Sequence, residues 1–377
     1  MLFQDVRNIL DHAFQKVGGS THIAVISNPE IVARVEIVAR NLQNRAAVRL
    51  ILSCSLAKIH NPKVDIRKPY TEIGGADCYS GRTYDEEHLA QFLFDNDLPC
   101  NPTTAFLTPA LRNRNVILTP ELNMVGRPPV VYQASLQLLT DVNIGAITAE
   151  DLLAETLRLL VVLRQEQRQR MDALLAGIRT VEGAVPLSAE GIVTLVEQHL
   201  RLPGTSRLPV LIVAAAYEAC GVQLGERIKP LESHNAADKQ TGSVGDIEVT
   251  LIGDDAVITC YEMKMKRVTH GDIDIALKKI VAHSIQNYIF ITTDVIDPLL
   301  KEYAASVYER SGGVEIVILD CIGFLRHFLH LFHKHRTAFV EAYQQLILDQ
   351  PVSAVSAALK EAWLALRQAT ESRPDES

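Results

Sequence analysis

A chain of 377 residues exceeds one average domain, so two domains are expected, each able to bury a hydrophobic core. With six singly scattered cysteines, no signal peptide and no uncharged apolar run long enough to cross a bilayer, the composition excludes a disulfide scaffold and an integral membrane protein and predicts a cytoplasmic protein. The net charge of −8 excludes a protein that coats nucleic acid nonspecifically, because such binding depends on many phosphate contacts from Lys and Arg.

The first half of the chain, residues 1–183, predicts a mainly helical domain. Residues 28–59 carry apolar side chains at helical spacing, which indicates one long helix or a helical hairpin. Residues 61–127 are rich in Pro, Gly, Asn and Thr and predict loops, with one helix at 85–94. Helical periodicity resumes at 148–178. Because Arg and Asn side chains on loops often carry function, this domain is predicted to help recognise a partner.

The second half begins after a short break that contains Pro and Gly, and it alternates helices with strands. Residues 184–335 are predicted to form an α/β domain, and residues 336–377 to add C-terminal helices and a disordered tail. Strands rich in β-branched residues at 246–252 and 256–264 form a predicted hairpin. The remaining elements expected here are helices at 189–200, 209–220, 273–285, 298–310, 321–333 and about 337–370, and two parallel strands at 288–292 and 314–319.

The hairpin gathers charged side chains if its register is right. Alternation places Asp246 and Glu248 on one face of the first strand, and Glu262 and Lys264 on one face of the second. A three-residue turn at 253–255 sets Asp246 directly opposite Glu262, with Cβ atoms about 5 Å apart. A two-residue turn separates the carboxylates. The predicted site therefore requires the odd turn, or an even turn with a bulge.

Two carboxylates held close suit a hard divalent cation such as Mg²⁺. Such a cation polarises a phosphoryl oxygen and lowers the pKa of a bound water, and a neighbouring lysine can orient that water or stabilise developing charge. Asp246, Glu262 and Lys264 are therefore predicted to be catalytic, with Asp246 and Glu262 as the metal ligands. A Glu-x-Lys on a strand is more often a solvated face. Here apolar neighbours predict a strand buried on both faces, where unpaired charges are costly.

These residues resemble the PD-(D/E)XK motif of restriction endonuclease-like nucleases, with Gly245 where that family often has Pro. The resemblance implies a restriction endonuclease-like core, a mixed sheet flanked by helices, in which the Asp and Glu hold Mg²⁺ and the Lys assists the attacking water. Residues 80–86 and 98–112 are similar to type II restriction endonucleases of the SacI family. That similarity implies cleavage of double-stranded DNA at a specific sequence, with a cognate DNA methyltransferase as functional partner. A homodimer is expected, because cutting both strands of a palindrome needs two sites related by a two-fold axis.

Further residues are secondary candidates. Glu218 lies near the end of the helix at 209–220, where many nucleases of this fold carry an extra acid, although a helix-surface role explains it better. Arg reads guanine and Asn reads adenine in the major groove. The candidates for DNA contact are Arg82, Arg112, Asn113, Arg114 and Arg127 in the N-terminal loops, and Asp238, Lys239, Lys266 and Arg267 around the catalytic strands.

Two alternatives to a restriction enzyme stay open. One is a repair or modification-dependent nuclease built on the same fold. The other is a DNA-binding protein that keeps the fold and is catalytically silent, although an intact Asp246, Glu262 and Lys264 argue against it. The four histidines at 327, 330, 333 and 335 do not form the i, i+4 pair of zinc hydrolases, so we interpret them as helix-end residues.

Overall fold

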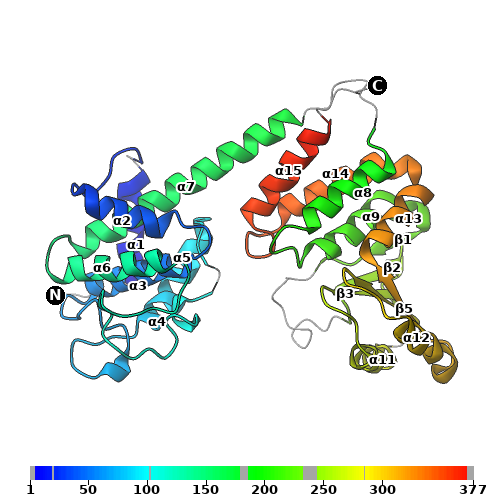
Figure 1. Cartoon of the computed structure of the whole chain (residues 1–377), viewed down its shortest axis with the longest axis horizontal. Coiled ribbons are helices and arrows are strands. Elements are labelled where there is room, and N and C mark those ends of the chain that lie inside the picture. Colours follow the sequence, from blue (N-terminus) through cyan, green and yellow to red (C-terminus); the bar gives the residue numbers. More distant parts are fainter. Residues whose placement is uncertain are drawn as a thin grey trace. The chain divides into compact units, whose positions relative to one another are not determined.

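The computed structural model describes residues 5–18, 21–101, 103–178, 186–231, 244–283 and 285–371. The chain divides into two compact units, Met1–Gln169 and Arg170–Ser377, each with its own hydrophobic core (Figure 1). The division falls inside the long helix α7 (Ala149–Gly177), whereas the sequence places a boundary at residues 183 and 184. No helix of the described ranges combines the length and apolarity needed to cross a membrane.

The first unit is helical, as predicted. Its α-helices are α1 (Val6–Gly18), α2 (Pro29–Ala39), α3 (Ala46–His60), α4 (Gly81–Thr83), α5 (Ala90–Asp95), α6 (Pro129–Asn143) and the start of α7. The segment predicted as one helix or a hairpin forms two helices, α2 and α3. The side chain of Asn28 caps α2 by accepting from the amides of Glu30 and Ile31, and α2 ends at Arg40. Residues Ala46 to Ala57 of α3 are all buried, so this helix is the centre of the unit.

The buried carboxylate of Asp85 links the loop-rich part of the first unit to α3. Asp85 lies in a π-helical turn, η2 (Tyr84–Leu89), that leads into α5. Its Oδ1 accepts from Arg49 Nε at 2.7 Å, and its Oδ2 accepts from Thr104 Oγ1 at 2.7 Å and from the Ala105 amide at 2.8 Å. The stretch around residues 98–112 therefore meets the stretch around residues 80–86 at Asp85.

The second unit is built on a mixed five-stranded sheet, which confirms the predicted α/β class. Its strands lie in the order β1-β2-β3-β4-β5. The strands are β1 (Glu226–Ile228), β2 (Ile247–Leu251), β3 (Val257–Lys264), β4 (Asn287–Thr292) and β5 (Glu315–Asp320). The first three are antiparallel, and β3, β4 and β5 are parallel, as the helical crossovers between them require. The sequence did not predict β1, which is only three residues long.

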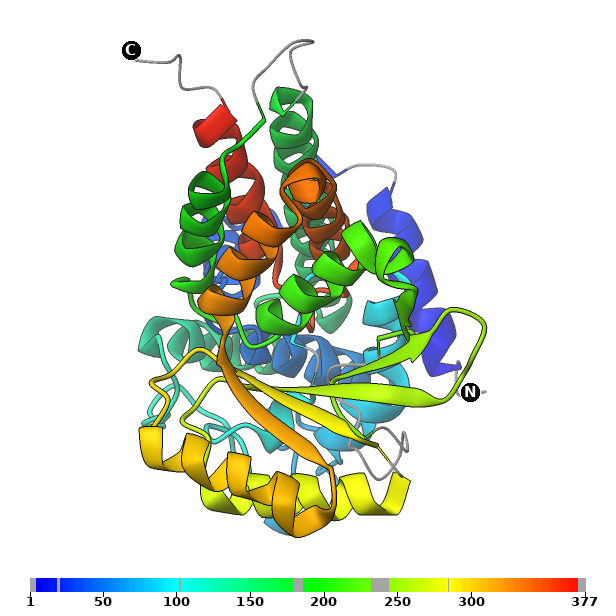
Figure 2. The ribbon, with the colours of Figure 1, turned by 90° about the vertical axis from the view of Figure 1, so that its right-hand side faces the viewer.

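Helices cover both faces of this sheet (Figure 2). One face packs against α11 (His270–His283) and α12 (Pro298–Ser311). The other packs against α9 and α13, with further helices beyond them. The helices of this side are α8 (Ala189–Leu200), α9 (Leu208–Leu224), α13 (Cys321–Leu331), α14 (Arg336–Asp349) and α15 (Ala357–Glu371). The single helix predicted at 337–370 is wrong: it is broken between α14 and α15, where Pro351 cannot continue a helix.

The register of the β2–β3 hairpin decides the geometry of the predicted site. Ile247 pairs with Tyr261 and Val249 with Thr259, but Thr250 pairs with Val257, so one extra residue of β3 forms a bulge. An even number of residues separates Thr250 from Val257. The predicted three-residue turn is therefore wrong, and the alternative of an even turn with a bulge is observed. From Val249 back to Ile247, the three-residue turn and the even turn with a bulge give the same pairing of β2 with β3.

Candidate active site

The predicted catalytic residues of β3 lie on the face of the sheet that α11 covers. Tyr261 lies in the core on the α9 side, and Cys260 lies in the core on the α11 side. Side chains alternate along a strand, so Glu262 and Lys264 take the same face as Cys260. Ile247 of β2 lies in the α9 core, which leaves Asp246, by the same alternation, on the α11 face. The three predicted residues therefore share one face.

Asp246 directly precedes β2 and is held against β3. Because Ile247 pairs with Tyr261, the next residue outward is at the position opposite Glu262. Its Oδ2 accepts a hydrogen bond of 2.7 Å from the amide of Met263. This close approach needs a glycine before it, since a Cβ at Gly245 would lie 2.7 Å from the carbonyl oxygen of Tyr261.

Glu262 and Lys264 form a partly exposed cluster of charges with α11. Lys264 Nζ lies 3.2 Å from Glu262 Oε1 and 3.2 Å from Asp272 Oδ1. Glu262 Oε2 accepts from the Tyr288 hydroxyl at 3.0 Å and lies 3.7 Å from Lys279 Nζ. The side chains of Glu262 and Lys264 are 20% and 29% exposed, so the cluster is partly shielded from water but open to a ligand.

The neighbours of Lys264 keep it charged. Burial alone lowers the pKa of this lysine, but the carboxylates of Glu262 and Asp272 outweigh burial and raise the pKa above its usual value. For Asp272, burial acts to raise the pKa, and the hydrogen bonds from Thr269 together with Lys264 outweigh it and lower the pKa. Lys264 is therefore an ammonium ion at neutral pH, suited to stabilise negative charge.

Helix α11 fixes the partner of this lysine. Asp272 Oδ2 accepts from the amide of Thr269 at 2.9 Å, and the Thr269 hydroxyl accepts from the amide of Asp272 at 3.3 Å. This reciprocal pair caps the start of the helix. The other oxygen of the same carboxylate is the one that contacts Lys264.

Sequence reasoning missed three residues of this cluster: Asp272, Lys279 and Tyr288. A Thr followed three residues later by an acid is a helix-start pattern, so the position of Asp272 could have been found. Lys279 and Tyr288 carry no local signal, because only the packing of α11 and β4 beside β3 brings them to Glu262.

The donor set fits a hard cation. In the part of the chain that the structure describes, no group of three or more His, Cys, Asp or Glu side chains is arranged to hold a metal ion. Asp246 and Glu262 supply carboxylate oxygens only, from facing positions. Such a pair suits Mg²⁺, which takes most of its other ligands from water and phosphate. It does not suit zinc, which prefers a closed set of nitrogen and sulfur ligands.

Glu218 is not brought to these residues. It is exposed on α9, which covers the opposite face of the sheet from Glu262. Partial burial of its carboxyl and the nearby negative charge of Asp349 on α14 raise its pKa. The helix-surface interpretation of Glu218 therefore agrees with its position.

The first unit holds five of the candidates for DNA contact. Arg114 donates to the carbonyl oxygens of Ala110 and Asn123, at 3.0 and 3.1 Å, so this guanidinium shapes its own loop. Arg82 forms an ion pair with Glu86, one helical turn away, with 2.9 Å between Nε and Oε1. The remaining three are exposed: Arg112, Asn113 and Arg127.

The other four candidates belong to the second unit. Lys266 is exposed just beyond β3. Arg267 forms an ion pair of 2.9 Å with Asp297, at the start of α12. Asp238 and Lys239 lie outside the described residues.

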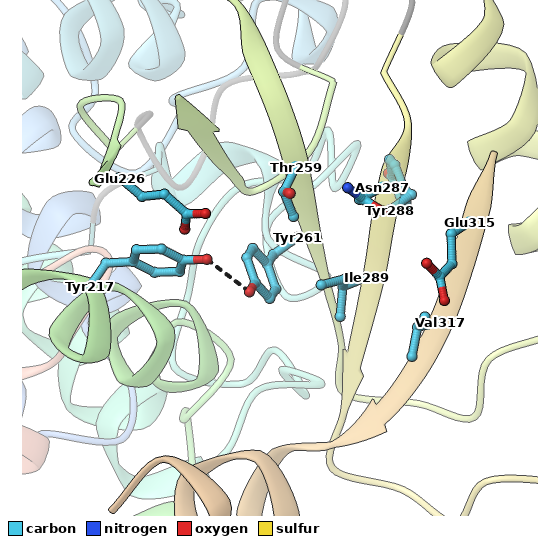
Figure 3. A pocket seen from close by; sticks show the side chains of 9 residues that line it. All are labelled: Tyr217, Glu226, Thr259, Tyr261, Asn287, Tyr288, Ile289, Glu315 and Val317. Carbon is cyan, nitrogen blue, oxygen red and sulfur yellow. Dashed lines mark hydrogen bonds between the residues drawn. The ribbon is translucent and has the colours of Figure 1, made fainter. Parts of the chain in front are cut away.

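The second unit also has a pocket whose lining does not include the three predicted catalytic residues (Figure 3). It has a volume of about 200 Å³, and its lining includes Tyr217 and Tyr261, whose hydroxyls lie 3.0 Å apart. Tyr261 belongs to the α9 side of the sheet, whereas Glu262 and Lys264 belong to the α11 side. Tyr288, whose hydroxyl donates to Glu262, also lines the pocket, so this residue connects the pocket to the charged cluster.

A comparison with known protein families finds a match within the second unit. Residues 188–293 match the model of the SacI restriction endonuclease C-terminal domain. The matched segment runs from the start of α8 to the end of β4, so it contains Asp246, Glu262 and Lys264 together with Asp272, Lys279 and Tyr288. No curated protein matches the chain. Over these residues the second unit is thus similar to the C-terminal domain of SacI restriction endonucleases, and this similarity supports a nuclease that acts on DNA.

Proposed function

We propose that this chain is a Mg²⁺-dependent endonuclease that hydrolyses phosphodiester bonds of double-stranded DNA at a specific sequence, through a PD-(D/E)XK site. One observation carries the proposal. Lys264 Nζ lies 3.2 Å from Glu262 Oε1, on the strand that faces Asp246, inside the segment that matches the SacI domain. This combination of two acids and a lysine is what phosphoryl transfer needs, because that chemistry depends on positioning and charge neutralisation more than on a protein nucleophile.

Each residue has a distinct task in this proposal. Asp246 and Glu262 hold Mg²⁺ through their carboxylate oxygens. When bound, the cation supplies charge neutralisation at the scissile phosphate and makes a coordinated water more acidic. Lys264, kept as an ammonium by Glu262 and Asp272, orients the attacking water or stabilises the negative charge that develops on the phosphate. Asp272 holds the lysine in place from the capped end of α11.

The proposal extends to the assembly. Cutting both strands of a palindromic sequence needs two sites related by a two-fold axis, so we propose a homodimer. Side chains of the first unit are proposed to contact base edges, with Arg112 and Asn113 better suited than Arg114, whose guanidinium is bound to its own main chain. A cognate DNA methyltransferase is the functional partner that such an enzyme requires.

A digest of unmethylated plasmid DNA, with and without Mg²⁺ and with the ends mapped, tests the proposal. We expect discrete fragments with Mg²⁺, ends at one fixed sequence, and intact plasmid in EDTA. Cutting only of methylated or structured DNA would instead identify a repair or modification-dependent nuclease. DNA binding without any cutting would overturn the enzymatic assignment.

A further inference from the structure

Tyr288 of β4 contacts one proposed metal ligand, Glu262, and the main chain close to the other, Asp246. The residue is 1% exposed, and its hydroxyl is a buried polar group that needs partners. Its single proton is shared between two acceptors, Glu262 Oε2 at 3.0 Å and the carbonyl oxygen of Val244 at 3.2 Å. Val244 precedes Asp246 by two residues. One hydroxyl therefore links the side chain of the second acid to the main chain that carries the first.

A second group contacts the same two oxygens. Lys279 Nζ donates to the carbonyl of Val244 at 3.3 Å and lies 3.7 Å from Glu262 Oε2. A phenol from β4 and an ammonium from α11 thus converge on one carbonyl and one carboxylate oxygen. Glu262 Oε1 is left to face Lys264.

We infer that Tyr288 is a positioning residue for the reaction: its hydroxyl fixes the carboxylate of Glu262 relative to Asp246, and so sets how tightly the site binds its divalent cation. The inference rests on the proposed function. Hydrogen bonds to a ligating carboxylate orient it, and loss of such a partner typically weakens metal affinity or activity about 10- to 100-fold. Tyr288 contacts neither substrate nor cation in this role, and it acts only through Glu262.

The change Tyr288→Phe isolates this role. The ring packs against Phe290, with centroids 5.3 Å apart, and Phe keeps that contact while removing only the hydroxyl. No charge is lost, so a change in cation affinity reports the orientation of Glu262. The chain offers a matched control in Tyr303→Phe, because the Tyr303 hydroxyl also donates to a carboxylate, Asp274 Oδ1 at 2.7 Å, outside the site.

Titration with Mn²⁺ alone, without DNA, gives a readout independent of activity. We expect Tyr288→Phe to bind Mn²⁺ about 10-fold more weakly than wild type, while Tyr303→Phe binds as wild type does. In cleavage assays the Mg²⁺ concentration for half-maximal rate should rise by a similar factor, and kcat at saturating Mg²⁺ should recover most of its wild-type value. A merely structural tyrosine would lower the melting temperature without moving the Mg²⁺ requirement.

The outcomes separate the inference from the function on which it rests. If wild type binds Mn²⁺ and cuts DNA, but Tyr288→Phe has the same affinity and Mg²⁺ requirement, the proposed function stands and the inference is overturned. If wild type neither binds Mn²⁺ nor needs Mg²⁺ to cut, the proposed function fails and the inference falls with it. Circular dichroism of each variant confirms that both comparisons are made on folded protein.

Discussion

Two clusters of opposite charges, one in each unit, differ in how their carboxylates are satisfied. In the first unit, Asp85 is fully buried, and both of its oxygens accept short hydrogen bonds from Arg49, Thr104 and the Ala105 amide. In the second unit, Glu262 is 20% exposed, and its partners are the ammonium groups of two lysines and one phenol, at 3.0 to 3.7 Å. The first cluster is closed to any ligand, and the second is open to one.

This difference distinguishes charged residues that stabilise the fold from charged residues that can bind a ligand. A buried carboxylate whose lone pairs are all used by its own chain costs least when nothing disturbs it, so Asp85 serves to join α3 to the loops around it. A partly exposed carboxylate held by lysines can exchange those contacts for a cation and a phosphate. Changes at Asp85 should therefore affect folding, and changes around Glu262 should affect catalysis.

The largest effect is expected from changes in the proposed catalytic residues. Asp246→Ala removes a proposed metal ligand, and Lys264→Ala removes the ammonium beside Glu262. Each variant should cut DNA at least about 100- to 1,000-fold more slowly, as loss of a transition-state stabilising group typically does. The free energy of unfolding and the affinity for DNA should change little, because both side chains are partly exposed. Rates from plasmid cleavage, with binding measured by fluorescence anisotropy, test this.

The matched control is Lys278→Ala, which removes an exposed lysine of α11 next to the site. This variant should cut at close to the wild-type rate. Undiminished cutting by Asp246→Ala or by Lys264→Ala would contradict the assignment of the active site.

The next largest effect is expected from the closed cluster. Asp85→Ala leaves Arg49 as an uncompensated charge in the core, because the Arg49 side chain is only 3% exposed. Breaking such a buried pair typically costs about 3–5 kcal/mol of stability. Urea unfolding followed by circular dichroism should therefore show an earlier transition for the first unit.

The neighbouring residue gives the control for this change. Glu86 forms an exposed i,i+4 pair with Arg82, and such pairs contribute about 0.2–1 kcal/mol. Glu86→Ala should therefore shift the unfolding midpoint only slightly. Equal effects of Asp85→Ala and Glu86→Ala would remove the distinction between the two clusters.

The sequence contained most of the information for the site and less for its surroundings. Strand alternation placed Glu262 and Lys264 on one face, but Asp246 opposite Glu262 required either an odd turn or an even turn with a bulge, and the second of these is observed. The turn was predicted wrongly because a bulge compensates for one residue, and local sequence does not distinguish the two solutions. Lys279 and Tyr288 could not be predicted, since their position depends on packing between elements that are separate in the chain.

A further buried polar cluster lies in the second unit, around His199. Like the cluster of Asp85, it is closed to ligands. His199 of α8 is fully buried, and its Nε2 donates to the carbonyl of Leu359 at 3.0 Å while its Nδ1 lies 3.2 Å from the Tyr343 hydroxyl. Since a carbonyl can only accept, the proton is on Nε2 and the hydroxyl donates to Nδ1. The ring also packs 5.4 Å from Trp363, the only tryptophan of the chain. Protonation of Nδ1 would remove an acceptor from this closed set.

The smallest of the expected effects is a pH dependence of this cluster. Burial lowers the pKa of His199 from 6.5 to about 4. The folded state therefore favours the neutral ring of His199. The contribution of this ring to the free energy of unfolding is present above pH 6.5 and is lost as the pH falls from 6.5 towards 4. The loss is at most about 3 kcal/mol. Trp363 fluorescence during urea unfolding at pH 7, 5.5 and 4.5 should show that loss in wild type and in the exposed control His333→Gln. His199→Gln should be less stable at pH 7 but lose less on acidification, because its amide does not titrate. A parallel decline in all three proteins would show that His199 is not held neutral by its surroundings.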